Sequence, residues 1–125
     1  MNNFSFIQNP SAYTDENAFV AILEAGLRVQ NELLKEISQK LNFPSYFGYN
    51  MDALSDCLRD LSWIGNYKVV IVHSDVPNIE AHELRAYLEV LDDAVSDWKG
   101  DETHSLEVFF PVHAASYLHR FGVTQ

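Results

Sequence analysis

The alternation of apolar and polar positions divides the chain into short strand-like runs and longer helical repeats. Short, mainly apolar runs rich in β-branched residues predict buried strands at residues 19–23, 67–73 and 106–110. Between these runs apolar residues recur every three or four positions, which predicts amphipathic helices over residues 31–43, 50–62 and 77–98. Strands that alternate with helices favour parallel pairing, so the predicted fold is α/β.

Local signals set the ends of the first two predicted helices. Asn31 and Asn50 are residue types that favour the N-cap position, and Pro44 stops the first helix. Residues 1–17 are mostly polar and include an Asn-Pro pair. We therefore expect this segment to lead into the fold rather than to form part of its core.

Length and charge narrow the class of protein. With 125 residues, of which 47% are hydrophobic, the chain has room for one core and predicts a single domain over residues 1–125. Eight Lys and Arg against eighteen Asp and Glu leave a formal net charge of −10. This charge repels nucleic acids and anionic membranes and speeds encounters with basic proteins, although solubility alone could also account for it.

Few features point to a compartment or to catalysis. The segment MNNFSFIQNP lacks the basic and apolar regions of a signal peptide, and no run is long enough to span a membrane, so we expect a soluble cytoplasmic protein. The single cysteine, Cys57, excludes an internal disulfide. The five histidines are scattered, and no phosphate-binding loop or nucleophile motif is present, so we expect no enzyme activity, metal or cofactor.

Three carboxylates recur every fourth residue in the second predicted helix, at Asp52, Asp56 and Asp60. At about 100° per residue they share the solvent side, because the apolar residues and Cys57 gather on the other side. The spacing alone leaves three interpretations open. The acids could be an ordinary solvated surface, an acid–base or metal-binding pair, or a surface for a cationic partner.

Aromatic residues precede these acids in the loop of residues 43–49. Tyr46, Phe47 and Tyr49 surround Gly48, which permits a tight backbone. Exposed rings beside an acidic patch are typical of a protein-binding surface, in which rings supply buried area and carboxylates meet Arg or Lys. The alternative is that the rings fill the core, which suits Phe47 and one tyrosine better than all three.

Residues 43–61 resemble the signature of the barstar family, the intracellular inhibitors of barnase-type ribonucleases. The matching pattern is Pro44-x-Tyr46-Phe47-Gly48-x-Asn50-x-Asp52-Ala53-Leu54-x-Asp56-Cys57-Leu58. A weaker likeness in the order of elements extends over residues 17–112, with short extensions at both ends. The resemblance implies a small three-stranded parallel sheet packed by helices in a three-layer arrangement.

The resemblance also implies a mode of action, in which an acidic helix and the loop before it plug the active site of a basic ribonuclease, one to one. It makes Asp56 the central acid, Asp52 its companion and Tyr46 an interface aromatic. Gly48 and Asn50 lie in the same contact loop. Members act without a cofactor, and we expect a monomer.

Other contact positions follow the pattern less closely. Counting back from the last strand makes Asp93 a further acid. Asp60, which the general pattern does not require, is expected to add a rim contact. The barnase inhibitor carries a tryptophan where this chain has Ser55, and a glutamate where it has Tyr49. The expected partner is therefore a ribonuclease that differs from barnase in its rim. Two alternatives are another basic protein, such as a deoxyribonuclease or a nucleic-acid-binding regulator, and an enzyme that uses Asp52 and Asp56.

Overall fold

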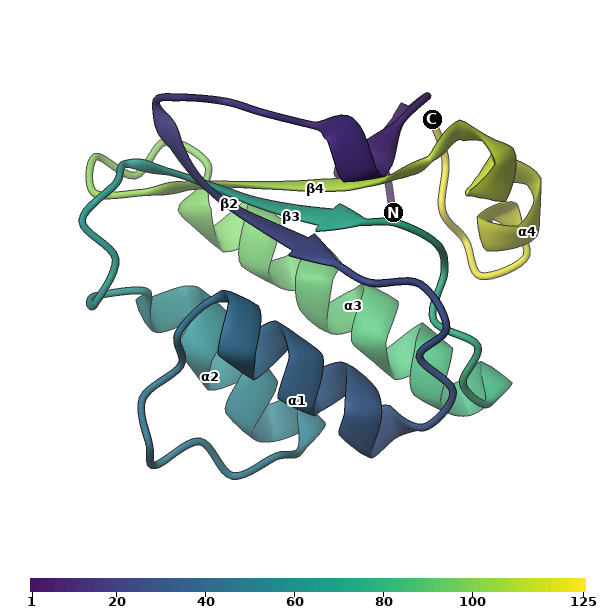
Figure 1. Cartoon of the computed structure of the whole chain (residues 1–125), viewed down its shortest axis with the longest axis horizontal. Coiled ribbons are helices and arrows are strands. Elements are labelled where there is room, and N and C mark those ends of the chain that lie inside the picture. The colour runs from purple at the N-terminus through teal and green to yellow at the C-terminus, as the bar shows by residue number, and fades with distance from the viewer.

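The computed structural model describes all residues 1–125 and contains one parallel sheet with helices against it (Figure 1). The elements follow the order β1 (Phe4–Ile7), η1 (Pro10–Ala12), β2 (Ala18–Leu23), α1 (Gln30–Lys40), α2 (Met51–Asp60), β3 (Lys68–His73), α3 (Ala81–Trp98), β4 (Ser105–Pro111), η2 (Val112–Ala114) and α4 (Ala115–His119). The predicted α/β class is therefore confirmed. No helix is both long and apolar enough to cross a membrane.

The sheet has four strands in the order β1-β4-β3-β2, one more than the three predicted. The additional strand, β1, pairs in parallel with β4, with Phe4 opposite Val108 and Ile7 opposite Pro111. Phe4 is only 5% exposed, and its ring meets Phe110 edge-on at 5.4 Å. The prediction that residues 1–17 only lead into the fold is therefore wrong, because their apolar side chains complete one edge of the sheet and its core.

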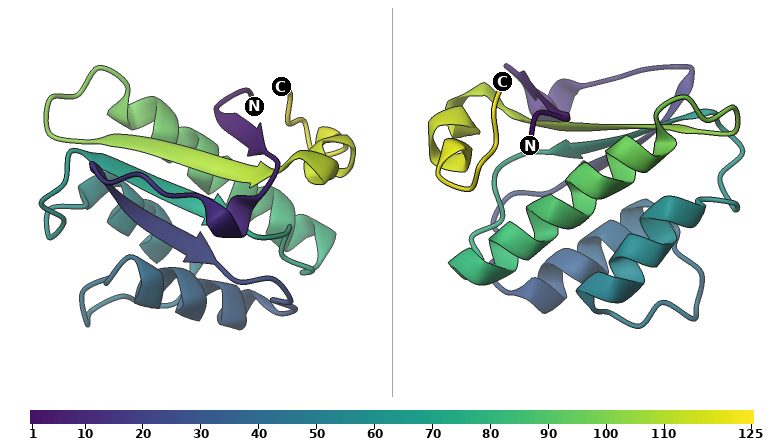
Figure 2. Two further views of the ribbon diagram at one scale, coloured as in Figure 1. Left: turned by 45° about the horizontal axis from the view of Figure 1, so that its top comes forward. Right: turned by 180° about the vertical axis from the view of Figure 1, so that it is seen from behind.

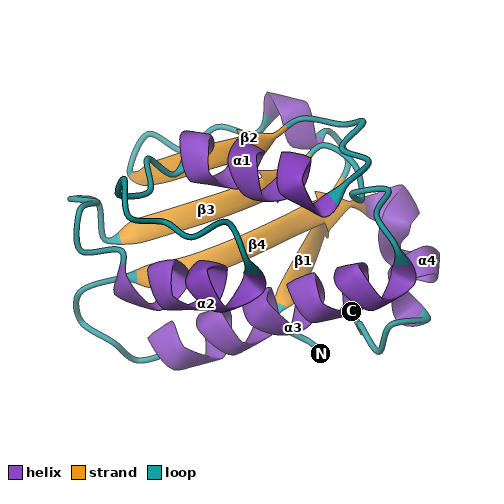
Figure 3. Ribbon diagram, turned by 90° about the horizontal axis from the view of Figure 1, so that it is seen from below, coloured by secondary structure: helices purple, strands orange, loops and turns teal.

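Helices α1, α2 and α3 all lie on one side of the sheet (Figures 1 and 3). Alternate strand residues point toward them, among them Leu106, Val108 and Phe110 of β4, all at most 4% exposed. Helix α1 packs on β2, α3 packs on β4, and α2 packs against α3. Because α2 and α3 each precede a strand of the same parallel sheet, they run in the same direction.

The N-terminal segment covers the opposite side of the sheet, where no long helix lies (Figure 2). Its Tyr13 ring packs on Phe109 at 4.9 Å, and its Asp15 carboxylate meets the Lys68 ammonium at 2.8 Å. Glu107 of β4 also meets Lys68, at 3.0 Å, and the hydrogen bonds that the ammonium donates to the Asp15 and Glu107 carboxylates raise the pKa of the lysine. This segment accounts for the complete burial of the apolar side chains on the second face of β3.

A buried histidine joins β3 to α3 and β4. His73 is 1% exposed and stacks on Phe110, with the ring centroids 4.0 Å apart. Its Nδ1 lies 3.0 Å from the carbonyl oxygen of Phe109, and its Nε2 lies 2.7 Å from the hydroxyl of Tyr87. A carbonyl can only accept, so Nδ1–H donates and Nε2 accepts from the tyrosine. Burial lowers the pKa of His73 to about 4, which favours this neutral ring.

The two ends of the chain meet at one edge of the molecule (Figure 2). The backbone N–H of Thr124 donates to the carbonyl oxygen of Met1 at 2.7 Å. Leu118 of α4 is fully buried and Phe121 is 7% exposed, so the C-terminal segment contributes to the core beside β1.

Candidate functional site

Helix α2 begins at the predicted cap. The side-chain Oδ1 of Asn50 accepts a hydrogen bond from the backbone N–H of Ala53 at 2.8 Å, while the Asn50 backbone is extended. The helix ends at Asp60, where Leu61 takes a left-handed conformation with φ 49°. By contrast, α1 begins at Gln30 after Val29, and not after the predicted cap Asn31. There the Glu32 carboxylate reaches back to accept from the N–H groups of Arg28 and Val29.

The two sides of α2 divide as the periodicity predicts. Leu54 and Leu58 are fully buried and Cys57 is 4% exposed. Burial, followed by the negative charges of Asp60 and Asp56, raises the pKa of the Cys57 thiol, which keeps it protonated and unreactive. The opposite side carries Asp52, Asp56 and Asp60, all exposed, and we call these three residues the acidic face.

The carboxylates of the acidic face make no hydrogen bond or ion pair within the chain. No group of three or more His, Cys, Asp or Glu side chains lies close enough to hold a metal ion. The three acids therefore stand in water on a capped, packed helix, with their acceptor positions free for an external donor.

The loop before α2 separates its aromatic residues into buried and exposed ones. Phe47 is 6% exposed and packs edge-on against Phe43 at 5.0 Å, and Phe43 in turn packs against Trp63 at 5.8 Å. Phe47 therefore lies in the core and supports the loop from beneath. Tyr46 is 74% exposed, and Tyr49 is 50% exposed with its ring 4.9 Å from that of Phe47. Only the two tyrosines offer rings to a partner.

The turn that was expected at Gly48 is made by the next residue, Tyr49. Tyr49 has the left-handed conformation, with φ 52°, whereas Gly48 has no positive φ. A Cβ added at Gly48 would meet its nearest neighbours, in Asn50 and Ala53, at ordinary distances of 3.5 Å and 3.7 Å. The loop therefore turns at a tyrosine whose ring packs on Phe47, and space does not require the glycine.

Helix α3 brings further acids beside α2. The Nε of Arg59 lies 3.0 Å from the Oδ2 of Asp97, and the indole Nε1 of Trp98 donates to the carbonyl oxygen of Leu58 at 2.7 Å. Since the two helices run in the same direction, Asp93 and Ser55 both lie one turn before this ion pair. Asp93 is exposed and Ser55 is half-buried. The structure therefore places Asp93 on the helix that flanks the acidic face.

Arg59 and Asp97 were not among the residues predicted for this region. Asp97 follows Asp93 by four residues, the spacing of one helix face, and this was the available signal. The pairing itself depends on how α2 packs against α3, which the sequence pattern does not specify.

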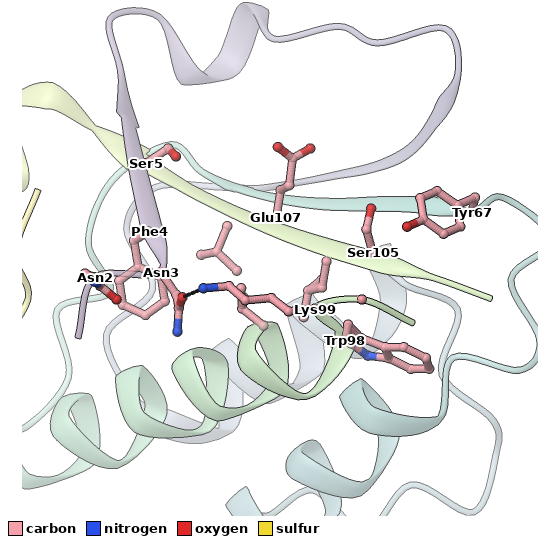
Figure 4. A pocket seen from close by; sticks show the side chains of 13 residues that line it. Asn2, Asn3, Phe4, Ser5, Tyr67, Trp98, Lys99, Ser105 and Glu107 are labelled. Carbon is pink, nitrogen blue, oxygen red and sulfur yellow. Dashed lines mark hydrogen bonds between the residues drawn. The ribbon is translucent and has the colours of Figure 1, made fainter. Parts of the chain in front are cut away.

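An open pocket of about 310 Å³ lies elsewhere, between β1, the start of β4 and the end of α3 (Figure 4). Its lining includes Asn3 and Lys99, and the Lys99 ammonium donates to the Asn3 side-chain oxygen at 2.6 Å. None of the predicted contact residues lines it. Neither this pocket nor the one beside α4 includes a candidate residue, so the site is an open surface of helix and loop, which suits a macromolecular partner better than a small ligand.

Comparison with known proteins agrees with this geometry. The family model described as Barstar (barnase inhibitor) matches residues 17–111, which include the aromatic loop, the acidic face and most of the sheet. Searches of curated proteins and of solved structures gave no significant match. The elements β1 and α4 lie outside the matched region. The chain belongs to the barstar family.

Proposed function

We propose that this protein is a cytoplasmic immunity protein that binds a basic, barnase-like ribonuclease and blocks its active site. The complex is one to one, with the inhibitor as a monomer. Asp56 is the central contact, and Asp52 and Asp60 lie one turn before and after it. Tyr46, Tyr49, Asn50, the Gly48 backbone and Ser55 form the rim, and Asp93 contributes from α3. Phe47 holds the loop in place from the core.

The observation that carries this proposal is the unpaired state of the acidic face on a rigid element. Asp52, Asp56 and Asp60 form no ion pair with any cation of the chain, while α2 is capped by Asn50 and held to α3 by the Trp98 hydrogen bond. A ribonuclease active site presents cationic side chains that normally hold a phosphate. Carboxylates on a rigid helix can take the place of that phosphate at a low entropic cost, because the helix already orients them.

The charge of the whole chain supports the same function. A net charge of −10 attracts a basic nuclease over a distance of about one Debye length and speeds capture, an effect that salt weakens. The exposed rings of Tyr46 and Tyr49 supply apolar area that excludes water around the charged contacts. Charge thus favours rapid binding, while rings and carboxylates together favour slow release.

The test is inhibition of barnase, the nuclease that the family description names, at low and high salt. We expect stoichiometric inhibition that weakens with salt. Asp56→Ala should weaken binding by about 2–5 kcal/mol, because it leaves a nuclease cation buried without a partner. This range comes from measured complexes that include barnase with its own inhibitor.

The matched control is Glu16→Ala, which removes the same charge from the opposite side of the sheet. Glu16 is exposed and makes no ion pair, so this variant should reproduce only the general loss of charge. Equal inhibition by the Asp56→Ala and Glu16→Ala variants would show that the acidic face is not the contact surface. Tight binding to a different basic protein without ribonuclease inhibition would instead support the alternative of an acidic module for another target.

A further inference from the structure

One cation, Arg59, lies on the exposed side of α2 beside the acidic face, and this residue is not part of the family pattern described above. Arg59 follows Asp52 by seven residues and Asp56 by three, so it projects within about 20° and 60° of them around the helix axis. It is the only basic residue of α2. Any partner that covers Asp52 and Asp56 therefore also meets the guanidinium group.

The surrounding contacts hold Arg59 in place but leave much of it available. Its Nε lies 3.0 Å from the Asp97 Oδ2, and its side chain is 44% exposed. No other hydrogen bond or ion pair engages the guanidinium, so its two terminal nitrogens remain free to donate. The Trp98 hydrogen bond to Leu58 fixes the adjoining turns of α2 and α3, which keeps Arg59 beside Asp97.

This arrangement changes the charge that a partner meets along the α3 side of the face. Arg59 pairs with Asp97, so the exposed side of α2 combines the unpaired carboxylates of the acidic face with a guanidinium and its paired acid on the α3 side. A partner cation next to Arg59 would be repelled, whereas a carboxylate or carbonyl oxygen would be bound. An exposed ion pair of this kind contributes little to folding, so stability alone gives weak reason for the arginine.

We infer that Arg59 is a specificity-determining residue of the proposed interface. It selects a nuclease whose rim presents a hydrogen-bond acceptor opposite the α3 side, and it disfavours a nuclease whose rim is basic throughout. This inference rests on the proposed function, since it concerns the same binding surface. It adds a repulsive element to a surface that otherwise attracts any basic protein.

The experiment measures the affinity and association rate of barnase for the wild type and for Arg59→Ala, Arg59→Lys and Arg120→Ala. Arg120 is exposed, has no ion pair, and lies in the C-terminal segment, so its removal matches the change in net charge away from the face. Arg59→Ala removes the repulsive charge and releases the Asp97 carboxylate. We expect it to bind barnase about ten-fold more tightly than Arg120→Ala, and Arg59→Lys to behave as the wild type.

Two further variants separate a local charge effect from altered packing of the helices. Asp97→Ala leaves Arg59 without its acid and should weaken barnase binding, opposite to the effect of Arg59→Ala, although both break the same ion pair. The double variant should fall between the two. If both single variants changed affinity in the same direction, loss of the helix contact would explain the result and the inference would be overturned.

The remaining outcomes distinguish the inference from the proposed function. In one outcome, the wild type inhibits barnase, Asp56→Ala does not, and Arg59→Ala and Arg120→Ala bind with the same affinity. This outcome supports the proposed function and overturns the role of Arg59. Inhibition only after Arg59→Ala supports both. If neither the wild type nor Arg59→Ala inhibits barnase, Arg59 is not the residue that excludes this nuclease and the inference fails. In that case the evidence against the proposed function is the failure of the wild type to inhibit barnase, and it does not depend on the Arg59→Ala variant.

Discussion

The neutral His73 ring at the end of β3 makes folding stability depend on pH in a defined window. In the folded chain its Nε2 accepts from Tyr87 and its Nδ1–H donates to Phe109, so protonation would force the tyrosine hydroxyl to accept instead of donate and would charge a buried ring. Burial accordingly lowers the pKa of His73 from 6.5 to about 4. Between these values the unfolded chain binds a proton that the folded chain does not.

The sign and size of the effect follow from this difference. The stabilisation is fully present above pH 6.5, falls as the pH is lowered, and is lost by about pH 4. A pKa unit corresponds to about 1.4 kcal/mol, so the loss amounts to about 3 kcal/mol. The lowered pKa values of Asp15 and Asp101 start from 3.8 in the unfolded chain, so their contribution is lost mainly at lower pH.

The assay is urea unfolding at several pH values from 7.5 to 4, with His73→Phe/Tyr87→Phe as the control. The double variant removes the titrating ring together with the hydroxyl that bonds to it, so it keeps an aromatic pair without the proton uptake. The wild type should lose about 3 kcal/mol more than the control across the window. Equal slopes, or a His73 imidazole that titrates near pH 6.5 by NMR in the folded protein, would refute the reasoning.

Three other substitutions test the packing around the site. Phe4→Ala should cost about 3–5 kcal/mol in urea unfolding, because the ring is buried, and a loss below 1 kcal/mol would mean that β1 adds little to the fold. Asn50→Ala removes the acceptor for the Ala53 N–H and should cost about 1 kcal/mol, with increased amide exchange in the first turn of α2 if the cap acts as described. Trp98→Phe leaves the carbonyl of Leu58 without its indole donor and should cost about 1–3 kcal/mol, while unchanged stability would show that water replaces the indole.

The parts of the fold that the sequence predicts are those with strong local signals. The three predicted strands and three predicted helices are all present, because their apolar periodicity coincides with their burial. Asn50 caps α2 because its short side chain reaches back to a free N–H, a purely local interaction. Asn31 fails as a cap because Glu32 satisfies the same kind of donors from inside the helix, so α1 begins earlier.

Strand β1 could not be predicted with the same tools. Four residues with polar neighbours carry little signal, and the strand exists because the edge of β4, about a hundred residues later, offers backbone partners to Phe4 and Ser5. The candidate site shows the same division. The outward direction of Asp52 and Asp56 follows from helical periodicity, whereas the Arg59–Asp97 pair depends on the packing of two helices.

The carboxylates of the acidic face form no hydrogen bond or ion pair within the chain, so this surface can change during evolution independently of the fold. Asp52, Asp56 and Asp60 hold no other part of the fold, so substitutions there alter recognition with little penalty in folding. The buried side of α2 stays fixed by Leu54, Leu58 and the Trp98 contact. A chain built in this way can adapt to a changing binding partner by exchanging surface residues one at a time, and each intermediate remains a folded protein.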